Sequence, residues 1–224
     1  MNEKNLERAY VSISKEELCN LPAAEYSGKI IMVDSESKLD DALADLRASS
    51  IIGFDTETRP SFKKGQSFNV ALIQLATPDC CYLIRTNELG FPQNLIKLLE
   101  DKNILKVGLS IHDDFHNLRR VTEIEPDGFI DLQNYVKNYK IADNSLSRVY
   151  GILFGQRISK SQRLSNWEAA ELTEPQQKYA ALDAYACIRI YRYLKEGNFN
   201  PNESKYLTYP PEPNEEAEEE NANN

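Results

Sequence analysis

The chain has 224 residues, of which 41% are hydrophobic and 27% are charged, a composition typical of soluble globular proteins. This length suffices for one substantial α/β core, and no second stretch is long enough for another domain. No apolar run approaches the roughly 20 residues that a membrane-spanning helix requires. The polar N-terminus has no secretory signal, so we expect an intracellular, cytoplasmic protein.

The charge is unevenly distributed along the chain. Its formal net value of −9 alone argues against a nucleic-acid partner, but residues 198–224 contain seven glutamates and one lysine, which leaves residues 1–197 at −3. Because residues 210–224 hold no apolar side chain larger than alanine apart from three prolines, we expect residues 198–224 to form an acidic disordered tail. Basic residues can then dominate locally on the folded part.

Hydrophobic periodicity predicts alternating strands and helices after an N-terminal extension, residues 1–28. Strands are expected at residues 29–33, 50–55, 69–75, 80–84 and 104–108. Helices are expected near residues 39–46, 92–99, 131–139 and 145–153, from residue 112, and over 174–196 after a capping box of Thr173 and Gln176. Three consecutive strands followed by strand–helix alternation predict a single α/β domain with a mixed sheet flanked by helices.

Two carboxylates stand at the end of a strand that is expected to be buried. Asp55 and Glu57 are separated by one residue, so both side chains project from the same face of the strand. Ionised carboxylates so close together repel each other unless a cation lies between them. A strand end that turns into solvent would also explain the pair. Taken alone, the pair favours neither the cation site nor the solvent-exposed strand end.

The last predicted helix contributes a second polar pair. Tyr179 and Asp183 are four residues apart, hence on one face, among small alanines that permit close approach to the sheet. An aspartate within so apolar a segment favours a functional role over an incidental one.

The fourth acid comes from an adjacent pair in the middle of the chain. Phe115 and Leu118 mark the buried side of the predicted helix, and Asp114 lies four residues before Leu118, near that side. Asp113 is turned more toward solvent and is the fallback. The four acids Asp55, Glu57, Asp114 and Asp183 together predict a site that binds two hard divalent cations and hydrolyses a phosphodiester. Because all the ligands are oxygens, Mg²⁺ or Mn²⁺ is favoured over zinc.

Three motifs in this order resemble those of the DEDDy 3′–5′ exonucleases, in the DnaQ-like branch of the ribonuclease H-like fold. They are Phe54-Asp-Thr-Glu57, residues 106–118, and Tyr179-Ala-Ala-Leu-Asp183. Residues 70–75, 164–167 and 172–179 sharpen the likeness to the exonuclease domain of Werner-type helicases and, somewhat less, to ribonuclease D. The resemblance spans residues 29–197 and implies an exonuclease domain there, without a helicase or polymerase domain in this chain.

The resemblance also implies roles and a substrate. Asp55, Glu57 and Asp183 would hold the metal that activates water, Asp55 would also touch a second metal, Asp114 would act mostly through water, and the Tyr179 hydroxyl would orient the nucleophile. Nucleoside 5′-monophosphates would be released from the 3′ end. Single-stranded or 3′-recessed DNA is the favoured substrate, with RNA as the alternative.

Basic residues near these motifs are candidate nucleic-acid contacts, because cations beside the site can follow a phosphate backbone. Solvated loops are the alternative explanation for them. Werner-type domains have tryptophan at the position of His116, so aromatic packing on the substrate can differ here; Trp167 is expected to be a core anchor. The candidates are Arg59, Lys63, Lys64, His116, Arg157, Lys160 and Arg163.

Three other functions compete with this one. His112 and His116 have the spacing of a zinc-peptidase helix, but they are the only histidines and the chain indicates no third ligand. A catalytically silent member that binds nucleic acid or protein is a second alternative, against which the complete acidic set argues. A ribonuclease H-type endonuclease is the third, and the Tyr-x-x-x-Asp spacing favours the exonuclease.

Overall fold

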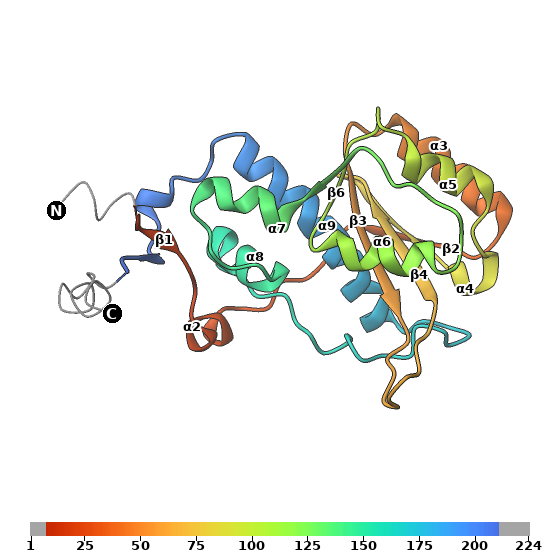
Figure 1. The fold of residues 1–224 in the computed structure, drawn as a ribbon, viewed down its shortest axis with the longest axis horizontal. Coiled ribbons are helices and arrows are strands. Elements are labelled where there is room, and N and C mark those ends of the chain that lie inside the picture. The colour runs from red at the N-terminus through yellow and green to blue at the C-terminus, as the bar shows by residue number, and fades with distance from the viewer. Residues whose placement is uncertain (1–7, 211–224) are drawn as a thin grey trace, which may run out of the picture.

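A mixed six-stranded sheet forms the centre of the structure, a computed structural model that describes residues 8–210 (Figure 1). Its strands are β2 (Lys29–Val33), β3 (Ile52–Thr58), β4 (Val70–Ala76), β5 (Cys80–Ile84), β6 (Lys106–Gly108) and β7 (Phe129–Asp131). They lie in the order β2-β5-β4-β3-β6-β7. The β3–β4 and β4–β5 pairs are antiparallel and the other three are parallel, which confirms the predicted mixed sheet.

Helices cover both faces of this sheet (Figure 1). One face packs against α3 (Glu36–Ala48), α5 (Gln93–Glu100) and α6 (Ile111–Arg119), and α4 (Thr86–Leu89) follows β5. The other face packs against α9 (Glu174–Lys195), and beyond it lie α7 (Leu132–Tyr135), the 3₁₀ helix η1 (Val136–Tyr139) and α8 (Leu146–Phe154). Two hydrophobic cores result, one on each side of the sheet, and strands β4, β5 and β6 are buried along their whole length.

A small second sheet joins segments from opposite ends of the described chain. Strand β1 (Tyr10–Val11) pairs antiparallel with β8 (Leu207–Thr208), which follows the 3₁₀ helix η2 (Pro201–Glu203). Residues 198–210 therefore contain regular structure, in contrast to the disordered tail expected from residue 198. The rest of the expected tail, residues 211–224, lies outside the described residues.

The predicted N-terminal extension packs along the helical side of the molecule from residue 8 onward. It contains α2 (Lys15–Asn20), which begins with a capping box of Ser14 and Glu17. Upstream of α2, the Ile13 backbone N–H donates to Asp143 Oδ2 over 2.8 Å. Downstream, Ala23 forms a parallel bridge with Arg157. This segment thus contacts the region just before and just after α8.

Across residues 8–210, no helix combines the length and apolar character needed to cross a bilayer.

Candidate active site

Strand β3 places the first two carboxylates on the face that α9 covers. Side chains alternate along a strand, so Asp55 and Glu57 point to one side, while Phe54 points to the other, into the core formed with α3, α5 and α6. The strand changes from buried to partly exposed at Asp55. The carboxylates therefore lie where the sheet opens toward solvent.

Close contact between β3 and α9 brings Asp183 to the same place. A Cβ atom added at Gly53 would lie 2.0 Å from the backbone oxygen of Ala184, so only glycine allows this approach. One carboxylate oxygen each from Asp55, Glu57 and Asp183 lies within 4.8 Å of the others. Residues that are 128 positions apart in the chain, Asp55 and Asp183, thus belong to one acidic cluster.

Helix α6 contributes Asp114 beside this cluster. Its Oδ1 accepts a hydrogen bond from the Thr56 hydroxyl, between Asp55 and Glu57 on β3. Asp113, the alternative from the sequence, is exposed. The structure therefore places Asp114 at the site and Asp113 away from it.

An additional aspartate, which the sequence analysis missed, fixes the turn that leads into α6. Asp131 Oδ1 accepts from the Ser110 backbone N–H over 2.9 Å and from the Gln133 backbone N–H over 2.8 Å. Ser110 has a left-handed backbone, φ 63°, which non-glycine residues seldom adopt. Asp131 is the N-cap of α7, and an aspartate just before a helix could have been identified as a cap from the sequence. Its hydrogen bond to Ser110 has no sequence signature.

Burial and mutual repulsion make the cluster electrostatically unfavourable without a counter-charge. Burial is the main cause that raises the pKa of Asp183 and of Asp114 to about 7 and that of Glu57 to about 9. The pKa of Asp55 is raised well above its usual range by burial and by the neighbouring Asp114, Asp183 and Glu57. Cations oppose this effect, because Arg163 lowers the pKa of Glu57 and Lys160 that of Asp183.

Tyr179 lies one helical turn before Asp183 and is hydrogen-bonded to its carboxylate. Burial first, and then the charge of Asp183, raise the pKa of the phenol, so the hydroxyl stays protonated and available as a donor. The ring lies near Trp167, with centroids 6.1 Å apart. Trp167 is fully buried, in agreement with the expected core anchor.

A cavity of about 410 Å³ opens onto the cluster. Asp55, Tyr179 and Asp183 line one side, and Lys160 and Arg163 line it from the segment after α8. Polar residues that the sequence analysis did not identify complete the lining, among them Ser110, Gln133, Asn144 and Ser145. They come from connecting segments without a motif, so only the fold reveals them.

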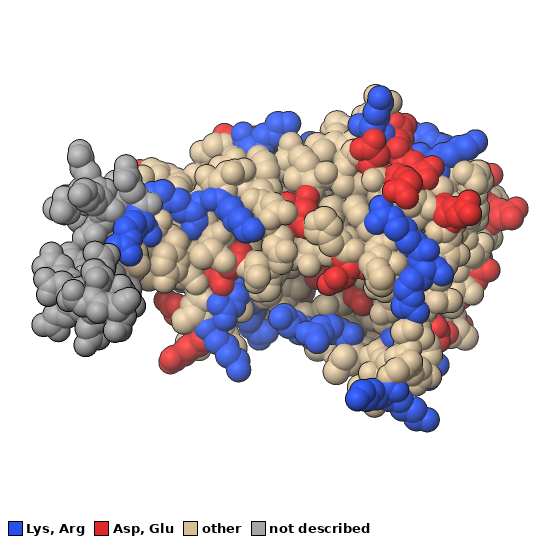
Figure 2. All heavy atoms as spheres, in the orientation of Figure 1, with Lys and Arg blue, Asp and Glu red and all other residues tan. Residues whose placement is uncertain are grey.

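The other basic candidates lie at different places. Arg59, Lys63 and Lys64 are exposed on the loop between β3 and β4, and His116 is exposed on α6. Arg157 instead holds the N-terminal segment: its Nε donates to the Leu21 carbonyl over 3.1 Å. Figure 2 shows Lys and Arg side chains along the lower edge of the molecule, on both sides of a hollow.

The donor set fits hard divalent cations. Among residues 8–210, Asp55, Glu57 and Asp183 form the only group of three or more metal-ligating side chains in mutual reach, and all its donors are carboxylate oxygens. Such ligands suit Mg²⁺ or Mn²⁺, whose charge would also offset the repulsion between the carboxylates. His112 and His116 belong to no such group, so the described structure offers the zinc-peptidase alternative no site.

The raised pKa values predict that divalent cations stabilise the protein more strongly at high pH. Asp183 has an ordinary pKa of 3.8 that rises to about 7 in the fold. Between these values the folded state retains a proton that the unfolded chain releases, so the metal-free protein loses stability as pH rises. Cation binding requires the ionised form. We therefore expect Mg²⁺ to raise the unfolding temperature more at pH 8 than at pH 6.

Thermal unfolding at both pH values, with MgCl₂ or with KCl of equal ionic strength, measures this effect. Asp183→Asn removes one ligand and should reduce the Mg²⁺-dependent shift. A shift that is the same at both pH values, or equally large with KCl, would show that the cation does not bind to these carboxylates.

Comparison with known proteins agrees with this geometry. A family model described as 3′–5′ exonuclease matches residues 30–197. The mouse bifunctional 3′–5′ exonuclease/ATP-dependent helicase WRN is 36% identical over 185 residues, which are 78% of this chain and 13% of that protein. A 3′–5′ exonuclease of Arabidopsis thaliana is 30% identical over 194 residues, 79% of this chain and 67% of that protein. The chain thus spans about an eighth of the WRN protein and two thirds of the plant protein.

Solved structures confirm the predicted ribonuclease H-like fold. The EXO domain of Aedes aegypti Nibbler superposes with a TM-score of 0.70 at 26% identity, over 81% of this chain and 97% of that one. By sequence, the chain is also similar to ribonuclease D of Bartonella henselae, to which it is 27% identical over 185 residues, 81% of this chain and 45% of that protein. The resemblance inferred from the three motifs is therefore confirmed.

Proposed function

The chain belongs to the 3′–5′ exonuclease family, and from this membership we propose that it removes nucleotides singly from the 3′ end of a nucleic acid, releasing nucleoside 5′-monophosphates. One observation supports this most: three carboxylates from β3 and α9 meet within 4.8 Å beside a polar cavity. The domain responsible would span residues 29–197.

We propose that Asp55, Glu57 and Asp183 hold one divalent cation and that Asp55 also touches a second. When bound, the two cations would lower the pKa of the attacking water and neutralise charge on the departing 3′-oxygen. The protein's own task is to hold these carboxylates in place around the cations, and the close β3–α9 contact supports this. Asp114, oriented by Thr56, would accept hydrogen bonds from surrounding water.

The remaining cavity groups would position the substrate. Tyr179 keeps its proton, so its hydroxyl can orient the attacking water for in-line approach to phosphorus. Lys160 and Arg163 line the same cavity and supply positive charge for the terminal phosphate. Positioning of this kind contributes a large part of the rate in phosphoryl transfer.

DNA is the substrate that we favour, either single-stranded or 3′-recessed. The support is the identity to the WRN protein, 36%, against 27% to the ribonuclease D relative. RNA is the second candidate, favoured by that ribonuclease D relative. The experiment below separates the two substrates.

Digestion of matched DNA and RNA strands, each labelled at the 5′ end, tests the proposed activity. With Mg²⁺ or Mn²⁺ we expect a ladder that shortens one nucleotide at a time from the 3′ end, faster for DNA, and no products in EDTA. The control substrate is a covalently closed single-stranded circle, which an exonuclease leaves intact. Cleavage of the circle, or activity that persists in EDTA, would contradict the proposal; no cleavage of any strand would indicate a catalytically silent member.

A further inference from the structure

The two cations of the active-site cavity, Lys160 and Arg163, are held only through their backbone. Both line the cavity together with Asp55 and Asp183, and both are exposed. Within residues 8–210, neither side chain forms a hydrogen bond or an ion pair. Their distance from the carboxylates therefore depends on the chain that carries them, residues 157–163, which we call the basic segment.

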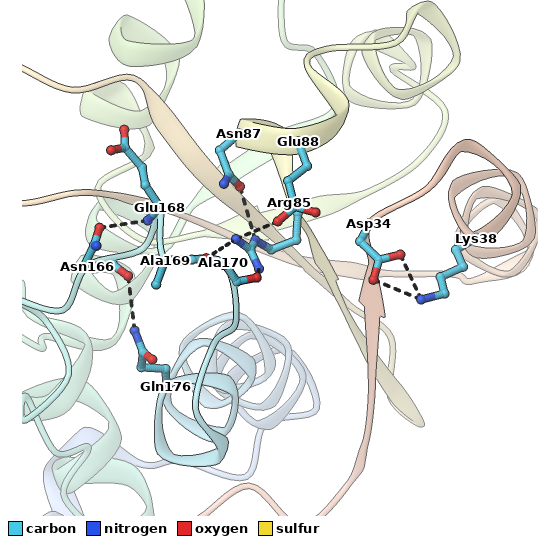
Figure 3. Close-up of polar contacts among 10 residues, drawn as sticks. All are labelled: Asp34, Lys38, Arg85, Asn87, Glu88, Asn166, Glu168, Ala169, Ala170 and Gln176. Carbon is cyan, nitrogen blue, oxygen red and sulfur yellow. Dashed lines mark hydrogen bonds and ion pairs between the residues drawn. The ribbon is translucent and has the colours of Figure 1, made fainter.

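The chain that follows the basic segment is anchored firmly, as Figure 3 shows. The buried Arg85 guanidinium donates to the Ala169 carbonyl over 2.5 Å. Gln176 Nε2 donates to the Asn166 carbonyl over 3.5 Å. These two contacts fix the downstream end of the basic segment to β5 and to the start of α9.

The upstream end of the basic segment is held by a distant part of the chain. The Arg157 backbone N–H donates to the Pro22 carbonyl, and the Ala24 N–H donates to the Arg157 carbonyl, each over 2.9 Å. The Arg157 Nε also donates to the Leu21 carbonyl over 3.1 Å. Three hydrogen bonds thus join a single residue of the basic segment to residues 21–24.

This N-terminal segment is itself anchored before α8. The Ile13 N–H donates to Asp143 Oδ2 over 2.8 Å, and Arg148 Nη1 donates to the Ile13 carbonyl over 2.9 Å. Ile13 is also fully buried. Residues 13–24 are therefore attached at both ends, although they lie outside residues 30–197, which the exonuclease family model matches.

A cavity of about 440 Å³ separates the N-terminal segment from the basic segment. Ala24 lies on one wall, and Ser159 and Tyr179, which also line the active-site cavity, lie on the other. The basic segment thus has a cavity on each side instead of packed side chains. Besides the contacts of Arg157, its upstream end is held by the hydrogen bonds of Ile158 to the Ser147 hydroxyl.

We propose that residues 13–24 act as a brace that holds Lys160 and Arg163 in position for the phosphates of the substrate. The inference rests on the proposed exonuclease function and extends the active unit beyond residues 29–197. Arg157, a candidate nucleic-acid contact in the sequence, is then a positioning residue that acts through the two cations.

Two neighbouring alanines provide a matched pair of variants in the full chain. Ala24→Pro removes the N–H that donates to the Arg157 carbonyl and places a ring carbon against that oxygen. Ala23→Pro is the control, because the Ala23 N–H takes no part in the two hydrogen bonds of the bridge. Neither substitution changes the charge of the protein.

Hydrogen exchange, followed by mass spectrometry, measures the holding of the basic segment without any substrate. We expect the amides of residues 157–163 to exchange about fivefold faster in Ala24→Pro than in Ala23→Pro, the effect of losing about one hydrogen bond. The amides of β4 should exchange as in the wild-type protein. Equal exchange of residues 157–163 in the two variants would overturn the brace.

Binding of a 5′-labelled single-stranded DNA measures the consequence for the cations. Fluorescence anisotropy in EDTA, over a series of KCl concentrations, should show about tenfold weaker binding for Ala24→Pro at low salt. The slope of log affinity against log salt concentration should become shallower by up to about 1.4, about 0.7 for each of two lost phosphate contacts. Ala23→Pro should bind as the wild-type protein does.

A double-mutant cycle distinguishes positioning from general destabilisation. In a background of Lys160→Ala and Arg163→Ala, Ala24→Pro should weaken binding no further, because the brace acts through these two cations. An equal further loss in that background would overturn the proposal.

A second variant covers the case in which Ala24→Pro does not fold. Arg157→Lys keeps the positive charge and both backbone hydrogen bonds but loses the Nε contact with Leu21. It should change exchange and salt dependence in the same direction, by a smaller amount. If Arg157→Lys leaves both unchanged, the contacts of Arg157 do not position the basic segment.

Failure of the brace is distinguishable from failure of the proposed function. No binding and no cleavage of any strand by the wild-type protein would contradict the proposed function, while hydrogen exchange still decides whether the brace holds the basic segment. If the wild-type protein binds and cleaves, and Ala24→Pro exchanges faster but keeps the wild-type salt slope, the N-terminal segment does not position the cations. That result would overturn the brace alone.

Discussion

Replacing Asp183 by alanine is expected to slow cleavage by at least about 100-fold, by analogy with the removal of a single transition-state donor. Asp183 supplies one of three oxygens within 4.8 Å, so its loss removes a ligand and with it the charge that activates water. Single-turnover cleavage measures the chemical step, and calorimetry measures metal affinity. We expect both the rate of cleavage and the affinity for the metal to decrease in Asp183→Ala.

Two variants sharpen this test. Asp183→Asn keeps the shape, and because it removes a buried charge among like charges, the metal-free protein should be no less stable than wild type at pH 8. Tyr179→Phe keeps the ring and removes the hydroxyl, so it should slow cleavage less than Asp183→Ala and preserve metal binding. If Tyr179→Phe weakens metal binding equally, the division of roles between Tyr179 and Asp183 is wrong; if none of the variants slows cleavage, the active site lies elsewhere.

The second large effect is expected from a residue without a functional group. In Gly53→Ala, the new methyl would lie 2.0 Å from the Ala184 backbone oxygen, which cannot rotate away as a side chain does. Overpacking of a core typically costs 1–3 kcal/mol, and we expect a loss of about 3 kcal/mol in the free energy of unfolding. Since α9 must move from β3, Asp183 also leaves Asp55, and a displacement of about 1 Å can cost about 100-fold in rate.

Guanidinium unfolding and single-turnover cleavage, at a temperature where the variant is still folded, measure the two effects. Gly151→Ala is the matched control, because its new methyl would meet the flexible ends of Leu18 and Leu21 at 2.9 and 3.1 Å. It also lies within α8, where alanine is the better helix former. Equal behaviour of the two variants would mean that the β3–α9 contact does not position the active site.

The elements with strong periodicity could be predicted from the sequence. The long helix α9 and strands β2, β4 and β5 lie close to the expected ranges, because each buries a regular pattern of side chains. Strand β7 was missed: its first two residues were assigned to no element, and only Asp131 fell at the start of a predicted helix. The strand has only three residues, all partly exposed, and forms by pairing with β6, which local sequence does not encode.

The expected acidic tail shows a similar limit. Its composition is polar, but Tyr206 is buried and Leu207 pairs with Val11 of β1. A few apolar residues are enough to order a polar segment when a distant part of the chain provides a surface on which they pack. Composition averaged over 27 residues therefore placed the start of the tail too early.

The sequence alone determined the fold class and the set of chemically capable residues, because strand alternation and helix spacing fix which side chains share a face. Tertiary structure alone decided how they are used. Arg157 and Arg163 belong to one cationic stretch, yet Arg157 donates to Leu21 while Arg163 faces Glu57. Contacts between distant segments make that difference, since hydrogen-bond partners and burial depend on which surfaces meet, and local sequence does not record them.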